Sequence, residues 1–211
     1  MNKELIRKYN VPGPRYTSYP TVPYWDGEER FEVSEWKKSI IKTFEATNDS
    51  EGISLYIHLP FCEKLCHFCG CNKKITRQHS VEDPYIARVL KEWDLYCEFL
   101  PQKPKLKEMH LGGGTPTFLS AENLHILISG ILKKCELIDS PGFSFEAHPN
   151  STSYDKLLAL YKLGFNRLSL GIQDFDPEVQ RVINRPQSFE EVKEVSDNAR
   201  KIGYTSINYD L

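Results

Sequence analysis

The sequence predicts an α/β protein built around a parallel sheet. Short runs of β-branched and aromatic residues alternate with amphipathic stretches along the chain, and an intervening helix is the usual connection between two parallel strands. Helix-start and helix-stop signals separate these runs. The chain has 211 residues, of which 40% are hydrophobic, so it is long enough for one domain with a real core and is not of disordered composition.

Five segments are expected to be strands, because each is short and rich in β-branched or aromatic residues. They are residues 53–58, 108–111, 143–147, 167–172 and 205–211. No sequence repeat or low-complexity tract interrupts the pattern.

The first two expected helices each show a start signal and an apolar stripe. One has Asp83 as its N-cap and Pro84 at its first position, and the next begins at Ser120. Their apolar stripes are Ile86, Val89, Leu90, Trp93 and Cys97 for the first, and Leu124, Leu127, Ile128, Ile131 and Cys135 for the second.

Two further helices are marked by their ends. The third ends at Gly164, and the fourth opens with the capping box 188–191 and ends at Gly203. Cys97 and Cys135 belong to the apolar faces of the earlier helices, so we expect them to be small core residues and not ligands.

Three cysteines form a C-x-x-x-C-x-x-C run directly after the first expected strand. Cys62, Cys66 and Cys69 supply three thiolates, whereas a cubane iron–sulfur cluster has four irons, so one iron is left open. An open iron can take a small chelating ligand, such as the amino and carboxylate groups of S-adenosylmethionine. Gly70 allows the tight turn that such a loop needs.

A zinc knuckle with Cys71 as its fourth ligand is the alternative interpretation. His67 and His79 are nearby and could also bind zinc. Zinc sites usually consist of two separated C-x-x-C-like pairs or of histidines at a set spacing, and this single crowded run matches neither pattern. A set of thiols that binds nothing is the remaining possibility.

The cysteine run stands in a longer segment, YIHLPFCEKLCHFCGCN at 56–72, and this segment resembles the radical S-adenosylmethionine superfamily. Within that superfamily the chain resembles the oxygen-independent coproporphyrinogen III oxidase family. Further similar blocks follow the family order: PRYTSYP at 14–20, GGGTPT at 112–117, GIQDF at 171–175 and Asn184-Arg185. The likeness covers almost the whole chain.

The resemblance implies a partial (β/α)6 radical-SAM barrel, truncated after about five strands. We expect an N-terminal extended or helical segment at 1–50 that covers the substrate, and the incomplete barrel at 51–211. The chain ends at the fifth expected strand without a helix to cover it. We therefore expect an N-terminal fragment that is poorly stable and inactive by itself.

The prolines of residues 11–20 exclude a helix there, because they lack amide donors and restrict the preceding residues. The resemblance implies that this segment covers the active site. Arg15 and the neighbouring tyrosines would suit a substrate with carboxylates. One position departs from the family: His148 stands where an acidic residue is common in relatives.

Reactive groups of a parallel barrel collect at the C-terminal ends of its strands. The cysteine loop follows the first expected strand, Gly112–Thr115 follows the second, Glu146 lies near the end of the third, Gln173 follows the fourth and Asp210 ends the fifth. The resemblance implies that Tyr56, Gly113 and Glu146 contact the cluster-bound S-adenosylmethionine, with Tyr56 as the catalytic residue. It implies contacts to a second S-adenosylmethionine for Phe68, Gly114, Thr115, Gln173, Arg185 and Asp210.

The function implied by the resemblance is anaerobic oxidative decarboxylation of two propionates of coproporphyrinogen III to vinyl groups. The reaction gives protoporphyrinogen IX in haem biosynthesis and uses a 5′-deoxyadenosyl radical, a [4Fe-4S] cluster and an external one-electron donor. A haem chaperone of the same superfamily is the first alternative function, and a non-enzymatic zinc-binding module is the second.

Charge and hydropathy limit the other partners. The net charge of −2 gives no reason to expect a nucleic-acid partner. No apolar stretch is long enough to span a bilayer, and 1–7 shows no apolar region of a signal peptide. The six cysteines should remain reduced without export, so a cytoplasmic enzyme is expected.

Overall fold

The computed structural model describes residues 3–10 and 32–211. Contacts divide the chain into two compact units, Met1–Ser39 and Ile40–Leu211. Helix α1 (Lys3–Tyr9) belongs to the first unit, and helix α2 (Val33–Thr47) crosses from the first into the second. The expected cover segment at 14–20 lies outside the described residues, and the division expected at residue 50 stays a prediction.

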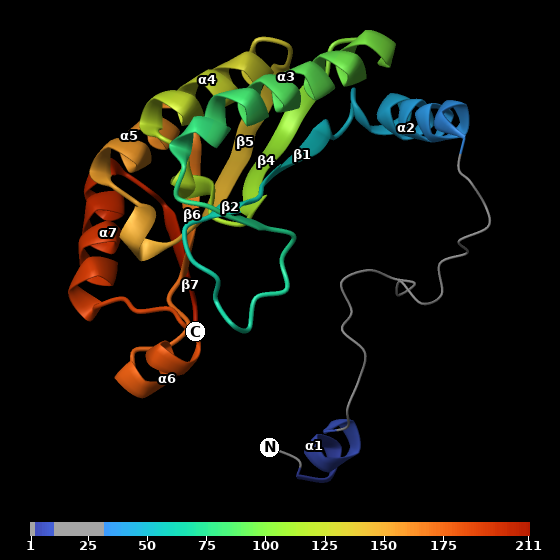
Figure 1. Ribbon diagram of the computed structural model, residues 1–211. Helices are drawn as coiled ribbons and strands as arrows, with labels where there is room; N and C mark the ends of the chain where they lie inside the picture. The colour runs from blue at the N-terminus through green and yellow to red at the C-terminus, as the bar shows by residue number, and fades with distance from the viewer. Residues whose placement is uncertain (1–2, 11–31) are drawn as a thin grey trace. The chain divides into compact units, whose positions relative to one another are not determined.

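A five-stranded parallel sheet forms the centre of the second unit (Figure 1). Its strands are β1 (Ile53–Leu59), β4 (Lys105–Gly113), β5 (Glu136–Ala147), β6 (Phe165–Gly171) and β7 (Ser206–Asp210), and they neighbour one another in this order. All five expected strands are confirmed. Strands β4 and β5 begin earlier than expected, at Lys105 and Glu136.

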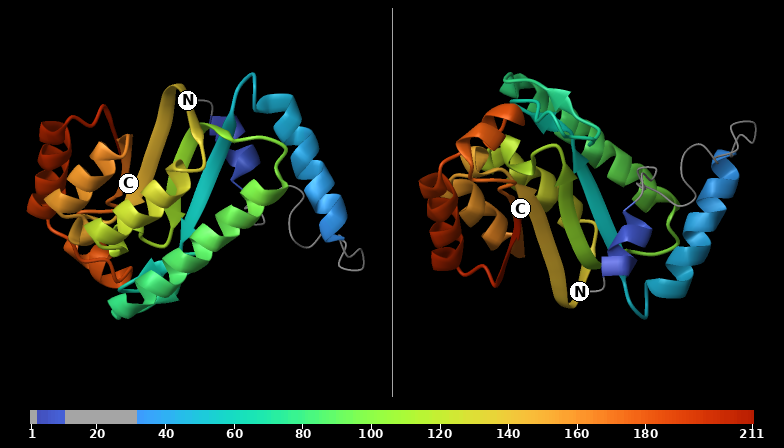
Figure 2. Two further views of the ribbon diagram at one scale, coloured as in Figure 1. Left: turned by 90° about the horizontal axis from the view of Figure 1, so that it is seen from above. Right: turned by 90° about the horizontal axis from the view of Figure 1, so that it is seen from below.

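Four helices lie along one side of this sheet, as the views of Figures 1 and 2 show. They are α3 (Glu82–Phe99), α4 (Ala121–Leu132), α5 (Tyr154–Lys162) and α7 (Phe189–Ile202). Ser120 caps α4 as expected, and the capping box of Ser188 and Glu191 is formed at α7. In the described part of the chain, none of the helices combines the length and the apolar character needed to cross a membrane.

The expected start of the first of these helices is wrong by two residues. Helix α3 begins at Glu82 with Val81 as its N-cap, because a short 3-10 turn at His79–Val81 runs directly into it. Asp83 therefore does not cap the helix. Its carboxylate accepts a hydrogen bond from Nδ2 of Asn123 on α4 over 3.0 Å.

Three short elements were not expected from the sequence. Strands β2 (Phe61–Cys62) and β3 (Lys74–Ile75) form a separate two-stranded parallel sheet, and helix α6 (Pro177–Val182) lies between β6 and α7. They have only two to six residues each, which is too short for periodicity to reveal.

The core fills the space between the sheet and its helices. Phe143, Phe145 and Phe165 are fully buried there. Cys135 is buried and Cys97 packs against the same core, as expected, although Cys135 follows α4 and is not part of it. Both thiols therefore pack as small apolar groups of the core, Cys135 buried and Cys97 partly buried.

The opposite face of the sheet is polar. Side chains of a strand alternate between its two faces, and the alternate residues that do not enter the core are Ser54, Tyr56, His58, Glu108, His110, Ser144, Glu146, Arg167, Ser169, Asn208 and Asp210. Branched apolar residues usually fill the inside of a parallel barrel. This face is instead suited to polar ligands.

Candidate functional site

The cysteine loop is closed at its base by the β2–β3 pairing. The amide of Lys74 donates to the carbonyl of Pro60 over 2.7 Å, and the amide of Thr76 donates to the carbonyl of Cys62 over 2.9 Å. A turn between Cys69 and Cys66 is closed by an amide-to-carbonyl bond of 3.0 Å. These bonds hold the loop at the C-terminal end of β1, where the sequence predicted it.

The tip of the loop is fastened to the segment after α6. The amide of His67 donates to the carbonyl of Ile183 over 3.0 Å, and its Nδ1 donates to the carbonyl of Val182 over 2.8 Å. Nδ2 of Asn184 donates to the carbonyl of Leu65 over 2.8 Å. Asn184 has a φ of 54°, a left-handed conformation that asparagine tolerates better than most residues.

Arg185 directs its guanidinium at the cysteine loop. Its Nη1 donates to Sγ of Cys66 over 3.3 Å, and its Nη2 donates to the carbonyl of Gly171 over 2.6 Å. A Cβ on Gly171 would lie 2.8 Å from that Nη2, so the glycine leaves the room that the guanidinium occupies. The Nε of Arg185 is buried and has no hydrogen-bond partner among the described residues.

A cavity of about 280 Å³ lies between these loops and the ends of the strands. It is lined by eleven of the residues that the sequence and the resemblance singled out: Cys62, Cys66, Phe68, Cys69, Gly113, Gly114, Thr115, Glu146, Gln173, Arg185 and Asp210. Tyr56 is not among the lining residues. The structure therefore brings together all of the expected site residues except Tyr56.

The glycine loop after β4 lies directly against the cysteine loop. The amide of Gly114 donates to the carbonyl of Leu59 over 2.8 Å, and the amide of Thr115 donates to the carbonyl of Phe61 over 2.9 Å. A Cβ on Gly114 would lie 2.7 Å from the carbonyl carbon of Pro60. A side chain at this position would push the two loops apart, so glycine is needed for their close approach.

The two carboxylates are held by neighbouring strands. Glu146 accepts a long bond of 3.4 Å from the amide of Gly113, and its Oε1 lies 3.7 Å from Nε2 of His110. Asp210 accepts from Oγ of Ser169 over 3.1 Å and from Nδ2 of Asn208 over 2.7 Å. Both side chains are exposed, so they can accept further hydrogen bonds from hydroxyl or ammonium groups of a ligand.

A backbone hydrogen bond holds Gln173 in position. Its φ is 73°, and its amide donates to the carbonyl of Asp210 over 2.7 Å. The bond ties the end of β6 to the end of β7, so both side chains face the same cavity.

Tyr56 lies on the polar face of β1, next to this cavity. Its hydroxyl donates to Nδ1 of His58 over 3.0 Å, because Nε2 of His58 donates to the carbonyl of Asn72 over 2.8 Å and a neutral imidazole then accepts through Nδ1. Its ring stacks on His110 with centroids 5.9 Å apart. Burial raises the pKa of Tyr56, and the negative charges of Glu146 and Cys71 add to the rise.

His148 also lines the cavity, on the loop after β5. Its Nδ1 accepts a hydrogen bond of 3.2 Å from the amide of Asn150, so it caps the short 3-10 turn at Pro149–Ser151. Burial lowers the pKa of His148 to about 3, and the positive charges of Arg185 and Lys64 contribute. This position therefore carries a neutral imidazole.

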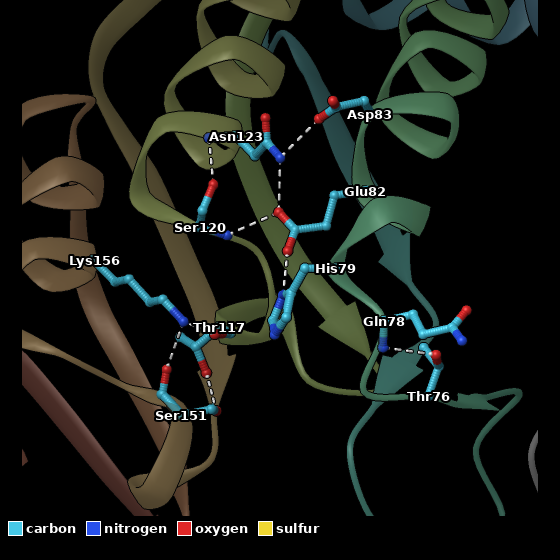
Figure 3. A network of polar contacts seen from close by, with 10 residues as sticks. All are labelled: Thr76, Gln78, His79, Glu82, Asp83, Thr117, Ser120, Asn123, Ser151 and Lys156. Atoms are coloured by element: carbon cyan, nitrogen blue, oxygen red, sulfur yellow. Dashed lines mark hydrogen bonds and ion pairs between the residues drawn. The ribbon is translucent and has the colours of Figure 1, made fainter.

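A buried carboxylate joins α3 to the start of α4, in a network shown in Figure 3. Glu82 accepts from the amide of Ser120 over 3.0 Å, from Nδ2 of Asn123 over 2.8 Å and from Nδ1 of His79 over 2.6 Å. Burial raises the pKa of Glu82, but the hydrogen bonds from Ser120, Asn123 and His79 outweigh this effect, so the pKa lies below its ordinary 4.5.

Lys156 fastens two of the cavity loops to each other (Figure 3). Its ammonium donates to the carbonyl of Thr117 over 2.6 Å and to the carbonyl of Ser151 over 3.0 Å. The hydroxyls of Thr117 and Ser151 lie 2.8 Å apart. Burial lowers the pKa of Lys156. The sequence showed neither this lysine nor Glu82, since each depends on a partner far along the chain: Glu82 binds Ser120, 38 positions away, and Lys156 binds Thr117, 39 positions away.

The surroundings of Cys62 act on the pKa of its thiol in opposite directions. Burial raises the pKa of Cys62, and the thiols of Cys69 and Cys66 act in the same direction. A contact of 3.4 Å with Oγ1 of Thr115 and the positive charge of Arg185 oppose the rise. The same hydrogen bond and the same charge would stabilise a coordinated thiolate.

The residues of this cavity fit an iron–sulfur cluster together with a polar ligand. Thiolate sulfur is the ligand that such clusters use, and the unpartnered Nε of Arg185 requires an acceptor. No group of three or more His, Cys, Asp or Glu side chains among the described residues is arranged for a single metal ion. The ligands of a cubane bind separate irons, so they need not converge on one point.

Residues 56–211 match the family model of the radical SAM superfamily. The chain belongs to this superfamily. Its five-stranded parallel sheet with helices on one side is a partial radical-SAM fold.

Within this superfamily, the chain is similar to oxygen-independent coproporphyrinogen III oxidases. The chain is 39% identical over 211 residues to an oxygen-independent coproporphyrinogen III oxidase of Pseudomonas aeruginosa, and it covers 45% of that protein. It is 40% identical over 207 residues to the enzyme of the same name from Escherichia coli, of which it covers 44%. The solved structure of coproporphyrinogen III oxidase from Escherichia coli matches 99% of the chain with a TM-score of 0.83 and 35% identity. The chain spans less than half the length of these relatives.

Proposed function

We propose that the protein is a coproporphyrinogen III dehydrogenase that works without oxygen. It would convert two propionates of coproporphyrinogen III to vinyl groups, giving protoporphyrinogen IX. Each conversion would transfer one hydrogen atom to a 5′-deoxyadenosyl radical, pass one electron to an acceptor and release one molecule of carbon dioxide. The observation that carries the proposal is the single cavity in which three thiols meet the glycine loop and the carboxylates at the strand ends. Relatives named oxygen-independent coproporphyrinogen III oxidase match the chain over nearly its whole length.

Cys62, Cys66 and Cys69 would hold a [4Fe-4S] cluster in this site. This proposal is supported by the bonds that fix their loop, at its base through the β2–β3 pairing and at its tip through His67 and Asn184. When bound, the cluster and S-adenosylmethionine supply a carbon radical that can abstract a hydrogen atom. Such chemistry requires an external one-electron donor and reduced thiols, which suits a reducing compartment such as the cytoplasm.

The polar residues of the cavity would bind and orient S-adenosylmethionine. Glu146 and Asp210 can accept from ribose hydroxyls or from an ammonium group, and the backbone at Gly113 and Gly114 can approach a ligand closely. By family resemblance Tyr56, Gly113 and Glu146 would contact the molecule on the cluster. Phe68, Gly114, Thr115, Gln173, Arg185 and Asp210 would contact a second molecule of S-adenosylmethionine.

The test of this function is an anaerobic assay with the protein as it is made in the cell. The protein is supplied with a reductant, S-adenosylmethionine and coproporphyrinogen III, and we expect protoporphyrinogen IX, carbon dioxide and 5′-deoxyadenosine. The Cys97→Ala variant is the matched control, because Cys97 packs against the core and lies outside the cavity. It should retain the activity.

Two results would contradict the proposal. Formation of 5′-deoxyadenosine without any porphyrinogen turnover, together with tight haem binding, would indicate a haem chaperone. A colourless protein that holds zinc and no iron after anaerobic purification would indicate a zinc-binding module.

A further inference from the structure

One row of side chains crosses the polar face of the sheet from β1 to β7. The strand register pairs Tyr56 with His110, His110 with Ser144, Ser144 with Arg167 and Arg167 with Ser206. Because each strand contributes every second residue to this face, the five side chains are neighbours. We call them the Arg167 row.

The row borders a second cavity, of about 320 Å³, which is separate in its lining from the cysteine cavity. Besides Leu55, Met109 and Gly142, this cavity is lined by Ser54, Tyr56, Glu108, His110, Ser144 and Arg167. Arg167 is the only Lys or Arg among the lining residues. A guanidinium at this place gives the cavity one permanently positive group.

The guanidinium of Arg167 forms no hydrogen bond and no ion pair with another residue of the described part of the chain. Three other members of the row, Tyr56, His110 and Ser144, are engaged with one another: Nδ1 of His110 lies 2.8 Å from Oγ of Ser144, and the ring of Tyr56 stacks on that of His110. Glu108 shares the cavity, but its carboxylate accepts a hydrogen bond of 2.8 Å from Oγ of Ser54. An arginine whose role was to balance this carboxylate would be paired with it.

The row lies next to the C-terminal ends of the strands, where the cysteine cavity is. Two residues further along the same strands, Glu146 of β5 is paired with Ser169 of β6, and Glu146 lines the cysteine cavity. Two residues of a strand span roughly 7 Å. A ligand of several rings that enters from the cysteine cavity could therefore reach Arg167 with one of its substituents.

We propose that Arg167 binds a carboxylate of the ligand that reacts in this barrel. The inference rests on the proposed function, because that function supplies a substrate with four propionates. A guanidinium presents two parallel N–H donors that match the two oxygens of a carboxylate. Ser144 and Ser206, which flank Arg167 in the row, offer hydroxyl groups on either side. When one propionate is bound by Arg167, the tetrapyrrole is oriented so that a different propionate lies beside Glu146, two residues further along the strands.

The test measures binding apart from turnover. Coproporphyrin III, the stable and fluorescent tetracarboxylate, is titrated into the anaerobically purified protein, and S-adenosylmethionine binding is measured by equilibrium dialysis. The variants are Arg167→Ala and Arg167→Lys, and Arg88→Ala is the control because it removes the same charge from an exposed position on α3. Circular dichroism shows whether each variant is folded. If Arg167→Ala does not fold, binding is measured with Arg167→Lys instead.

We expect Arg167→Ala to weaken coproporphyrin III about ten- to a hundredfold, the usual effect of losing a hydrogen bond to a charged group. Arg167→Lys should lose less, and Arg88→Ala should bind like the unmodified protein. Weaker binding of S-adenosylmethionine instead would assign the same subsite to the carboxylate of that cofactor. Unchanged affinity for both ligands would overturn the inference, whereas a failure of the unmodified protein to bind coproporphyrin III would overturn the proposed function beneath it.

Discussion

Nη1 of Arg185 donates a hydrogen bond to Sγ of Cys66 over 3.3 Å, although the two residues are 119 positions apart in the chain. Asn184, the preceding residue, binds the carbonyl of Leu65, so the Asn184-Arg185 pair is placed against the cysteine loop by two separate bonds. Hydrogen bonds and charges at the sulfur ligands are among the factors that set the potential of an iron–sulfur cluster. Arg185 is therefore in a position to tune the cluster as well as to contact a ligand.

Arg185→Gln should lower the reduction potential of the reconstituted cluster. A positive charge beside a ligand sulfur stabilises the reduced, more negative state, so its loss should shift the potential by on the order of −60 mV, or about 1.4 kcal/mol for a one-electron couple. Redox titration followed by electron paramagnetic resonance measures the shift. Arg181→Gln is the control, because Arg181 is exposed on α6 and pairs with Glu178. Equal potentials in Arg185→Gln and the unmodified protein would contradict this role.

Replacement of Cys62, Cys66 or Cys69 by alanine should each abolish cluster assembly, whereas Cys71→Ala should leave a cluster in place. A cubane with an open iron needs three thiolates, and Cys71 is one more than it can use. Iron and sulfide content after anaerobic reconstitution decides the matter. Loss of the cluster in Cys71→Ala alone would show that the ligands are assigned wrongly.

Gly114→Ala should destabilise the protein and impair cluster assembly. The added Cβ would lie 2.7 Å from the carbonyl carbon of Pro60 and 2.8 Å from the carbonyl oxygen of Phe61, and backbone atoms cannot move aside cheaply. We expect a loss of about 1–3 kcal/mol in the free energy of unfolding, measured with urea. Gly130→Ala is the control, because its Cβ would meet only the flexible end of Leu90. Equal stability losses in both variants would contradict the argument.

Glu82→Gln should lower the free energy of unfolding by about 1–3 kcal/mol at pH 7, since an amide cannot accept the hydrogen bonds of Ser120, Asn123 and His79 as a carboxylate does. The lowered pKa of Glu82 means that its stabilising effect is complete above its ordinary value of 4.5 and is lost as the pH falls through the lower folded value. Urea unfolding below pH 5 should therefore depend less on pH in the variant. Glu122→Gln, at an exposed position of α4, should change neither quantity.

His148→Gln should make the protein less sensitive to mild acid. The folded pKa of about 3 lies below the ordinary 6.5, so the unfolded chain takes up a proton first as the pH falls. The free energy of unfolding should decline as the pH falls from 6.5 towards 3, by ~2 kcal/mol at pH 5. The decline should be smaller by this amount in the variant. Nuclear magnetic resonance should show a neutral imidazole for His148 at pH 5. A protonated His148 at that pH, or an equal decline in the variant, would contradict the prediction, and exposed His125→Gln is the control.

Strand and helix positions could be predicted where the pattern is local. The capping box at 188–191 and the cap at Ser120 depend on residues within one helical turn, and both formed as expected. Asp83 shows the limit of this reasoning. It had the residue type of a cap, but Asn123, 40 positions away, binds its carboxylate, and the preceding 3-10 turn moved the helix start to Glu82.

Some residues of the candidate site could also be predicted from the sequence and others could not. The cysteine loop and Glu146 could be predicted because parallel strands place their C-terminal ends together. The buried Glu82 and Lys156 could not, since a charged residue in a sequence is normally taken to face solvent. Arg167 belongs to no sequence motif. Its place in a row that crosses five strands depends on the strand register, which only the structure gives.

The order of strands in the sheet is also their order in the chain, from β1 through β4, β5 and β6 to β7. Each strand of this sheet therefore pairs with the strand of the sheet that precedes it in the chain. A ribosome delivers the chain in this same order, so every β–α unit can dock on the edge left by its predecessor while synthesis continues. Among parallel sheets, which usually fold slowly because their contacts are non-local, this arrangement keeps each newly exposed edge unpaired only until the next strand emerges.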